Sequence, residues 1–443
     1  MNCKNVRQVN VIPDKEAEYG KLRGKRLLLL GGGSMMKEMV IRAKILGVYT
    51  LVMGMDMDSD EAKALCDKPI LGNARDVDEV IRVCKEERID GITTGYVDIL
   101  LQTCHDACER LGMPYYANNE LIKVTTNKSY YKEICKKYGI PAPKAYDITD
   151  INSEEQLRKI EYPVFIKPID ASGSRGAAIC NNEEELKDNY QKALKWSPSK
   201  TISVEEYLTG QDIILDYLVC DGKAHLVSIF DRMVTSDRKP PINSPNIQFA
   251  PSGAVDSFLN EVDSHVQAFC QGLGVKNGIL FFQGYNNNGK IKLFEMGCRM
   301  GASFFSIEEA FIGVNPIDVL IHYALTGMMT ETGDFSLITP KYRGVGCAVY
   351  LMLRSGVKEV SHMYGIDALS DIPYVEHVNS HKHTGDKVAW DRVTDVRILT
   401  IYIAAPDMAS VRRTVQLIYD TVKITDEKGE TILAPTYSVE LIK

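Results

Sequence analysis

The 443-residue sequence has no basic block, no long apolar run and no paired cysteines. Its net charge of −7 argues against nucleic acid as the main partner. Residues 1–21 contain no apolar stretch and are not predicted to form a secretory signal, and the longest apolar runs, such as 26–30, have the length of a strand rather than of a membrane span. Together these absences predict a cytoplasmic protein with no membrane contact.

The eleven cysteines do not show the paired spacing of a zinc site or a disulfide framework. Cys104 and Cys108 lie four residues apart on an expected helix, but no second pair follows them. His377, His381 and His383 lie close together in the sequence, and their polar neighbours favour a solvated loop over a metal site. We therefore expect reduced thiols in a cytoplasmic protein.

Two common catalytic signatures are missing: no G-x-x-x-x-G-K-[ST] loop occurs, and no serine–histidine–aspartate set is evident. Gly31–Gly33 stand between an expected strand and an expected helix, as in dinucleotide-binding proteins, but Met36 occupies the place of that motif's last glycine. A nicotinamide oxidoreductase that uses this turn and Asp56 is a minor alternative. A simple tight turn, or helix N-terminal amides that hold some anion, are the other interpretations.

A chain of this length is expected to fold into two to four domains. Strand and helix patterns alternate between residues 24 and 111, which predicts a parallel α/β domain. A Gly- and Pro-rich stretch at 139–143 ends a helix and turns the chain. The expected organisation is a leader at 1–23, an α/β domain at 24–125, a central domain at 126–335 with subdomains of about 126–200 and 201–335, and an α+β domain at 336–443.

A predicted hairpin carries the most informative polar residues. Ile279–Tyr285 and Ile291–Met296 are mainly apolar, and the Asn- and Gly-rich turn between them favours a tight hairpin. Gln283 and Glu295 interrupt these runs, and a buried carboxylate is costly unless it is paired or binds a metal. Arg299 follows four residues later. A structural ion pair between Glu295 and Arg299 is one interpretation, and a site for a metal ion and an anionic group is the other.

Small residues form a loop at 170–176, D-A-S-G-S-R-G, between two expected strands, and Lys167 stands at the end of the first strand. Backbone amides in such a loop form an anion-binding concavity, and glycine lets the backbone approach a ligand closely. The pattern fits a loop that folds over a triphosphate. An ordinary flexible hairpin tip is the alternative.

The order of these motifs resembles that of the ATP-grasp ligases, which join a carboxylate to an amine or a similar nucleophile through an acyl phosphate. The resemblance covers residues 24 to about 330, and 336–443 resembles the small cap domain of the carbamoyl-phosphate-synthase-like and L-amino-acid-ligase-like branches. It implies a fold with α/β and α+β parts: a Rossmann-like N-terminal domain, an ATP-grasp domain and a C-terminal cap. It also implies ATP with Mg²⁺ or Mn²⁺, small carboxylate and amine substrates, ADP and phosphate as products, and a homodimer as a common assembly.

The resemblance implies roles for individual residues. Lys128 and Lys167 resemble the lysine that reaches the α-phosphate and the lysine held between the α- and β-phosphates. The loop from Ser172 to Gly176, which includes Gly173 and Ser174, resembles the flap over the triphosphate. The remaining positions resemble the adenine-reading segment (Glu205, Glu206 and Leu208), the ribose-binding acid (Asp212), the two metal-site positions (Gln283 and Glu295) and the arginine on the acyl-phosphate side (Arg299).

One position departs from the family pattern, which usually reads E-x-N-x-R with the asparagine as a metal ligand. Gly297 occupies that position here, and with Gln283 as the other partner the ligand set carries one formal charge. Mg²⁺ would then depend on waters and substrate phosphates. A weaker second metal site is expected, and a non-catalytic nucleotide-binding relative is the alternative. Substrate specificity is expected to depend on the turn at 31–36, the cap, and the loop at 231–252, where Arg232, Arg238 and Lys239 either hold a substrate carboxylate or are solvated.

Overall fold

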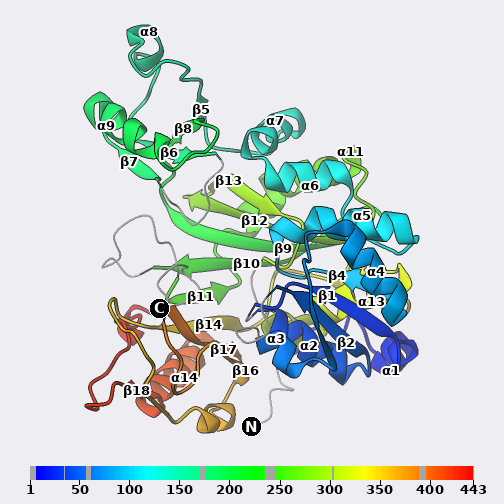
Figure 1. The fold of residues 1–443 in the computed structure, drawn as a ribbon. Coiled ribbons are helices and arrows are strands. Elements are labelled where there is room, and N and C mark those ends of the chain that lie inside the picture. The colour runs from blue at the N-terminus through cyan, green and yellow to red at the C-terminus, as the bar shows by residue number, and fades with distance from the viewer. Residues whose placement is uncertain are drawn as a thin grey trace.

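The computed structural model arranges the chain around one large sheet, with a parallel sheet on one side of it and a small antiparallel sheet above it (Figure 1). No helix among the described residues is long and apolar enough to cross a membrane. The structure describes residues 6–33, 35–55, 61–169, 176–234, 245–301, 304–388 and 396–442.

The N-terminal region confirms the predicted parallel α/β pattern. Its described strands follow the order β3 (Lys68–Leu71), β2 (Tyr49–Gly54), β1 (Arg26–Leu30) and β4 (Gly91–Thr93). Leu27 to Leu30 are fully buried, because helices cover both faces of this sheet. The helices of the region are α1 (Lys15–Tyr19), α2 (Met36–Ile45), α3 (Glu61–Leu65), α4 (Val77–Glu87) and α5 (Leu101–Leu111).

Two helices lead to the small antiparallel sheet: α6 (Asn119–Thr126) and α7 (Lys128–Tyr138). Asn127 caps α7 as predicted, since its side chain accepts a hydrogen bond from the Tyr130 amide at 3.0 Å. Gly139 ends the helix at a φ of 73°, which only glycine adopts readily. The small sheet has the order β5 (Ala145–Tyr146), β8 (Ile202–Glu206), β6 (Val164–Pro168) and β7 (Ala178–Cys180), with α8 (Glu154–Leu157) and α9 (Glu183–Leu194) beside it.

The large sheet is antiparallel throughout, and its described strands number eight. Its order is β13 (Lys290–Gly297), β12 (Gly278–Asn287), β9 (Gln211–Cys220), β10 (Lys223–Met233), β11 (Ile247–Ala250), β14 (Val345–Met352), β17 (Arg397–Ala405) and β16 (Val375–Ser380). Strands β12 and β13 form the predicted hairpin, with Asn288 and Gly289 at positive φ in the turn. Because β11 pairs with β14, the central and C-terminal parts share one sheet. The domain boundaries themselves stay predictions.

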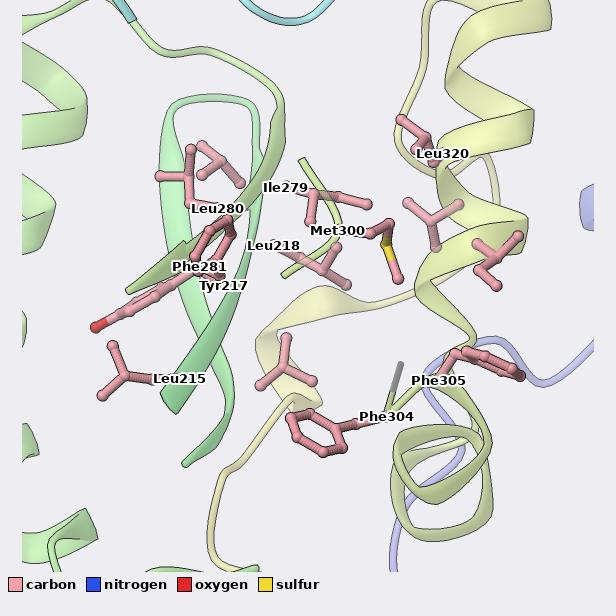
Figure 2. Packing of buried hydrophobic residues seen from close by; sticks show 14 of the residues in the cluster. Leu215, Tyr217, Leu218, Ile279, Leu280, Phe281, Met300, Phe304, Phe305 and Leu320 are labelled. Carbon is pink, nitrogen blue, oxygen red and sulfur yellow. The ribbon is translucent and has the colours of Figure 1, made fainter. Parts of the chain in front are cut away.

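We call the face of the large sheet that carries Asp212, Gln283 and Glu295 the site face. Helix α12 (Phe305–Ile312) begins on it, where Phe304 stacks on Phe230 and Phe305 contacts Tyr402, and Figure 2 shows these two phenylalanine rings pointing in opposite directions. The other described helices around the sheet are α10 (Val255–Glu261), α11 (Asp263–Gly272), α13 (Pro316–Thr326) and α14 (Met408–Thr421), and β15 (His362–Tyr364) pairs with β18 (Lys423–Thr425).

The expected solvated histidine loop is wrong for two of its three histidines. His377 lies on β16 and stacks on Tyr402, and its Nε2 lies 3.1 Å from a carboxylate oxygen of Glu38. His381 follows β16 and is 5% exposed, with Nε2 2.8 Å from the hydroxyl of Thr400. The polar neighbours of these histidines suggested a loop. They belong instead to strand β16, which has polar side chains on a buried face. The His383 side chain is 60% exposed, as expected.

Candidate active site

A buried carboxylate on the small sheet holds two lysines. Strands β6 and β8 pair Phe165 with Glu205, which places Lys167 and Glu205 on one face. The Lys167 ammonium lies 2.9 Å and the Lys132 ammonium 3.1 Å from Oε1 of Glu205, which is 2% exposed. Burial raises the pKa of this carboxyl, but the charges of the two lysines lower it overall. Glu205 therefore orients lysines through its side chain, in addition to any role of its backbone.

Sequence reasoning missed Lys132, although its position gives a signal. It lies one helical turn after Lys128 on α7, so both side chains lie on the same side of the helix. Burial is the largest influence on Lys132 and lowers its pKa, and the charges of Lys167 and Lys128 act in the same direction, against Glu205. Three lysines are thus close enough to affect one another, which is a favourable environment for a polyphosphate.

The expected adenine-reading segment joins the two sheets. Glu206 ends β8, and the Lys292 ammonium of β13 lies 2.6 Å from both of its carboxylate oxygens. The Lys144 amide donates to the same carboxylate at 3.0 Å. Leu208 is half-buried just beyond this point. A nucleotide base at this segment would lie at the junction of the two sheets.

The acid predicted to bind the ribose, Asp212, is paired with an arginine. Asp212 on β9 is directly opposite Arg232 on β10, and the Arg232 guanidinium donates to its two oxygens at 3.1 and 3.0 Å. Burial raises the pKa of Asp212, and Arg232 opposes this rise. Arg232 is therefore not solvated, and its charge is directed at Asp212.

The two predicted metal positions are brought together. Gln283 on β12 and Glu295 on β13 are direct partners, and side chains of antiparallel partners point to the same face. Contrary to the expectation of a buried carboxylate, Glu295 is exposed, and it forms no ion pair within the described residues. The interpretation as a Glu295–Arg299 ion pair is also wrong. Both carboxylate oxygens of Glu295 are available to a ligand.

Arg299 instead joins the hairpin to the N-terminal region. Its guanidinium donates to both oxygens of Asp98 at 2.8 Å and lies over the Phe281 ring, 4.7 Å from the centroid. The Met300 amide donates to the Gly95 carbonyl at 3.0 Å beside it. Burial acts to lower the pKa of Arg299, but Asp98 raises it overall. Asp98 could not be predicted from the sequence, because it is 201 residues away from Arg299 in the chain.

Steric crowding explains why position 297 is a glycine in this structure. It pairs with Phe281, and a Cβ at position 297 would overlap Cε1 of the Phe281 ring. The aromatic ring therefore occupies the volume where the family's asparagine would begin.

A buried pair of acids lies beside this site and was not predicted. Asp216 on β9 is opposite Phe281, and Glu308 of α12 accepts a hydrogen bond from the Ser228 hydroxyl at 2.7 Å. Burial raises the pKa of Glu308 to about 7, and burial together with the Glu308 charge raises that of Asp216. Buried acids of this kind are protonated at neutral pH more often than exposed ones.

Several predicted residues lie outside the described ones: Asp56, Ser172, Gly173, Ser174, Arg238 and Lys239. Gly176, the last residue of the predicted flap, is described and adopts a φ of 75°. A Cβ there would stand about 3 Å from Trp196 and Pro168, so glycine permits the close turn. The flap therefore stays a prediction.

Comparison with known proteins identifies the central region. Residues 127–329 match the family described as "Carbamoyl-phosphate synthase L chain, ATP binding domain". The chain contains an ATP-grasp domain. The matched region begins at the cap of α7, one residue before Lys128, and includes the small sheet together with the Gln283–Glu295 hairpin.

Curated relatives match part of this chain at low identity. The 2-oxoglutarate carboxylase small subunit of Hydrogenobacter thermophilus is 25% identical over 246 residues, which are 52% of this chain and 51% of the relative. A formate-dependent phosphoribosylglycinamide formyltransferase of Sulfurisphaera tokodaii is 28% identical over 212 residues, 45% of this chain and 51% of the relative. The chain thus matches about half the length of these relatives.

Solved structures show that the fold extends well beyond the ATP-grasp domain. The L-amino acid ligase from Bacillus licheniformis superposes with a TM-score of 0.71 and 17% identity, over 91% of this chain and 99% of that one. Biotin carboxylase from Campylobacter jejuni gives a TM-score of 0.73 and 17% identity, over 92% and 93%. The predicted ATP-grasp architecture, with its N-terminal and C-terminal parts, is therefore confirmed as a fold.

Proposed function

We propose that the chain is an ADP-forming ligase that activates a small carboxylate as an acyl phosphate and joins it to an amine or a similar nucleophile. The observation that carries this proposal is the pairing of Gln283 with Glu295, on the same sheet face as Asp212 and next to Arg299. Lys167 of the small sheet and Lys132 of α7 supply charges for a triphosphate. A homodimer and a cytoplasmic location stay predictions.

ATP would lie between the small sheet and the site face, with its base at Glu206 and Leu208. Lys128, Lys132 and Lys167 would contact its phosphates, and the ribose hydroxyls would replace Arg232 on Asp212. The loop from Ser172 to Gly176 would cover the phosphates and exclude water, which otherwise hydrolyses an acyl phosphate.

The residues present fit Mg²⁺ as the predicted metal, with Mn²⁺ as an alternative ion. Glu295 offers an uncommitted carboxylate and Gln283 an amide oxygen beside it. No group of three or more His, Cys, Asp or Glu suited to a metal occurs among the described residues, so substrate phosphates would supply further ligands. When bound, the ion would neutralise charge on the phosphates during transfer.

In the proposed reaction, a carboxylate oxygen of the substrate attacks the γ-phosphorus, and the bond to the β–γ bridging oxygen breaks. ADP leaves and an acyl phosphate remains. The amine then attacks the acyl carbon, loses a proton, and inorganic phosphate departs. Arg299 would stabilise the negative charge on the acyl-phosphate side, and Asp98 would hold its guanidinium in place.

A substrate screen tests the proposal. The protein is incubated with ATP, Mg²⁺ and mixtures of carboxylates and amines, and the nucleotide product is identified. ADP release that depends on a carboxylate is expected, whereas AMP and pyrophosphate would overturn the acyl-phosphate route. Lys167→Ala should abolish most turnover, and Lys187→Ala, which changes an exposed lysine paired with Glu183 on α9, should not.

A non-catalytic ATP-binding protein is the second candidate, and Gly297 favours it. The Phe281 ring fills the place of a metal-binding side chain, so the site offers fewer ligands. Such a protein would bind Mg·ATP but release no ADP with any pair of substrates. Substrate-dependent ADP release therefore separates the two candidates.

A further inference from the structure

The C-terminal half of the site face carries buried polar groups that the nucleotide site does not use. Asn379 on β16 is 1% exposed, and neither atom of its side-chain amide has a hydrogen-bond partner. Gln248 on β11 is 3% exposed, and its side-chain oxygen also lacks a partner. Buried polar groups are nearly always satisfied, so these atoms indicate a place for a ligand.

Strand register places these residues around an arginine. Asn379 is opposite Thr400, and Thr400 is opposite Tyr350, so the three lie on one face of adjacent strands about 5 Å apart. The Arg397 guanidinium lies over the Tyr350 ring, 4.4 Å from its centroid. Stacking on the ring restricts the orientation of the guanidinium and leaves its N–H groups free to bind in its plane.

Neighbouring residues across the sheet connect these polar groups with the nucleotide site. Gln248 is opposite Arg232, which in turn is opposite Asp212, and Gln248 is opposite Ala348 on the other side. Ala348 and Tyr350 are alternate residues of β14 and share the site face. A row of side chains therefore leads from the proposed ribose position to Arg397 and Asn379.

Positively charged side chains gather around these groups. The Arg397 side chain donates no hydrogen bond to, and forms no ion pair with, any residue that the structure describes, and its buried Nε atom lacks a partner. The pKa of His381 is lowered well below its usual value, first by burial and then by the charges of Arg397, Lys37 and Lys382. Of the nearby acids, Glu61 forms an ion pair with Lys37, and Glu38 lies 3.1 Å from Nε2 of His377.

We propose that Arg397 and Asn379, with Gln248 at the edge, form a subsite for an oxyanion of a substrate that also carries a hydrogen-bond donor. The oxyanion, a carboxylate or a phosphate ester, is distinct from the group that becomes phosphorylated. Arg397 and the Asn379 nitrogen donate to it, and the side-chain oxygen of Asn379 accepts from the donor. This subsite deepens the proposed function, on which it rests for the identity of the reaction.

Anion binding to the intact protein tests the subsite. Succinate and inorganic phosphate are titrated calorimetrically in the presence of Mg²⁺ and a saturating non-hydrolysable ATP analogue, and 1,4-diaminobutane serves as a cationic control. We expect at least one anion to bind and the diamine not to bind. Arg397→Gln and the isosteric Asn379→Asp should each weaken the anion at least tenfold, while Arg413→Gln, on an exposed face of α14, should not.

The outcomes are separable. Binding of succinate alone assigns a carboxylate and binding of phosphate alone assigns a phosphate ester, and either supports the subsite. Binding of neither anion to protein that binds the analogue overturns it, as does equal weakening by Arg397→Gln and Arg413→Gln. Failure to bind the analogue overturns the proposed function instead, and titration without nucleotide still tests the subsite. Unchanged analogue affinity in each variant shows that it is folded.

Discussion

The ring of Phe281 lies where a side chain at position 297 would begin. The two residues are direct partners on β12 and β13, and a Cβ on Gly297 would overlap the edge of the ring. The same ring lies beneath the guanidinium of Arg299. The glycine is therefore more than the loss of a metal ligand, because it makes room for an aromatic platform under the arginine that is bound to Asp98.

This relationship predicts coupling between the two positions. Gly297→Asn alone should lower the free energy of unfolding by about 1–3 kcal/mol, since the new side chain is forced against the ring. Phe281→Ala should also destabilise the protein by leaving a cavity. In the double variant the asparagine fills part of that cavity. The double variant should therefore lose less unfolding free energy than the sum of the two single variants, by at least about 1 kcal/mol. Urea unfolding of the four proteins measures this coupling, and strict additivity would contradict it.

Glu205 and Glu206 are neighbours in the chain, and we predict that they contribute very differently to stability. Glu205→Gln leaves two partly buried lysines without their carboxylate and should cost about 3 kcal/mol of stability, because lone buried charges are strongly unfavourable. Glu206→Gln removes an ion pair whose side chains are 33% and 37% exposed and should cost less than about 1 kcal/mol. Thermal unfolding at pH 7 compares them. Equal effects would show that Glu205 does not hold the lysines as described.

Local patterns in the sequence were enough to predict much of the fold. Alternating strands and helices predicted the parallel N-terminal sheet, the Asn-Gly turn predicted the β12–β13 hairpin, and Asn127 with Gly139 predicted both ends of α7. These signals depend on residues close together in the chain. The continuity of the central sheet with β14 could not be found in this way, because β11 and β14 are almost one hundred residues apart.

The candidate site was predictable in its residue types but not in its pairings. Gln283 and Glu295 come together because one hairpin joins them, whereas Asp98 reaches Arg299 through the packing of distant regions. The polar residues of β16 suggested a loop, since a sequence does not show which buried face a polar side chain occupies. The Phe281–Gly297 contact was hidden for the same reason.

The Arg299–Asp98 pair should affect turnover more than nucleotide binding. Arg299→Lys cannot form the bidentate contact and should lower kcat for ADP release by about 10²–10³. Asp98→Asn should lower it by a smaller factor, about tenfold, because the guanidinium keeps its charge but loses part of its orientation. The KM for ATP should stay nearly constant in both variants. A parallel rise in the KM for ATP, with kcat unchanged, would place Arg299 in nucleotide binding instead.

The buried acid Glu308 should make stability depend on pH. Its pKa rises from about 4.5 in the unfolded chain to about 7 in the folded protein, so the folded state binds more protons between these values. Stability should therefore fall as pH rises from about 5 to 7 and change little from this source above that range. Glu308→Gln keeps a partner for the Ser228 hydroxyl and removes the proton equilibrium. Relative to the wild type, this variant should gain on the order of 2 kcal/mol in unfolding free energy between pH 5 and pH 8.

Denaturant unfolding at pH 5, 6, 7 and 8 measures the difference between Glu308→Gln and the wild type. Glu261→Gln, at an exposed position at the end of α10, is the control and should show the wild-type pH dependence. Asp216 modifies the result, because it lies close enough for the Glu308 charge to raise its pKa. Removing that charge should let Asp216 ionise at a lower pH. Asp216→Asn in the Glu308→Gln background should consequently remove the share of the remaining pH dependence of stability that Asp216 contributes. A difference between Glu308→Gln and the wild type that does not change with pH would contradict the assignment of a raised pKa to Glu308.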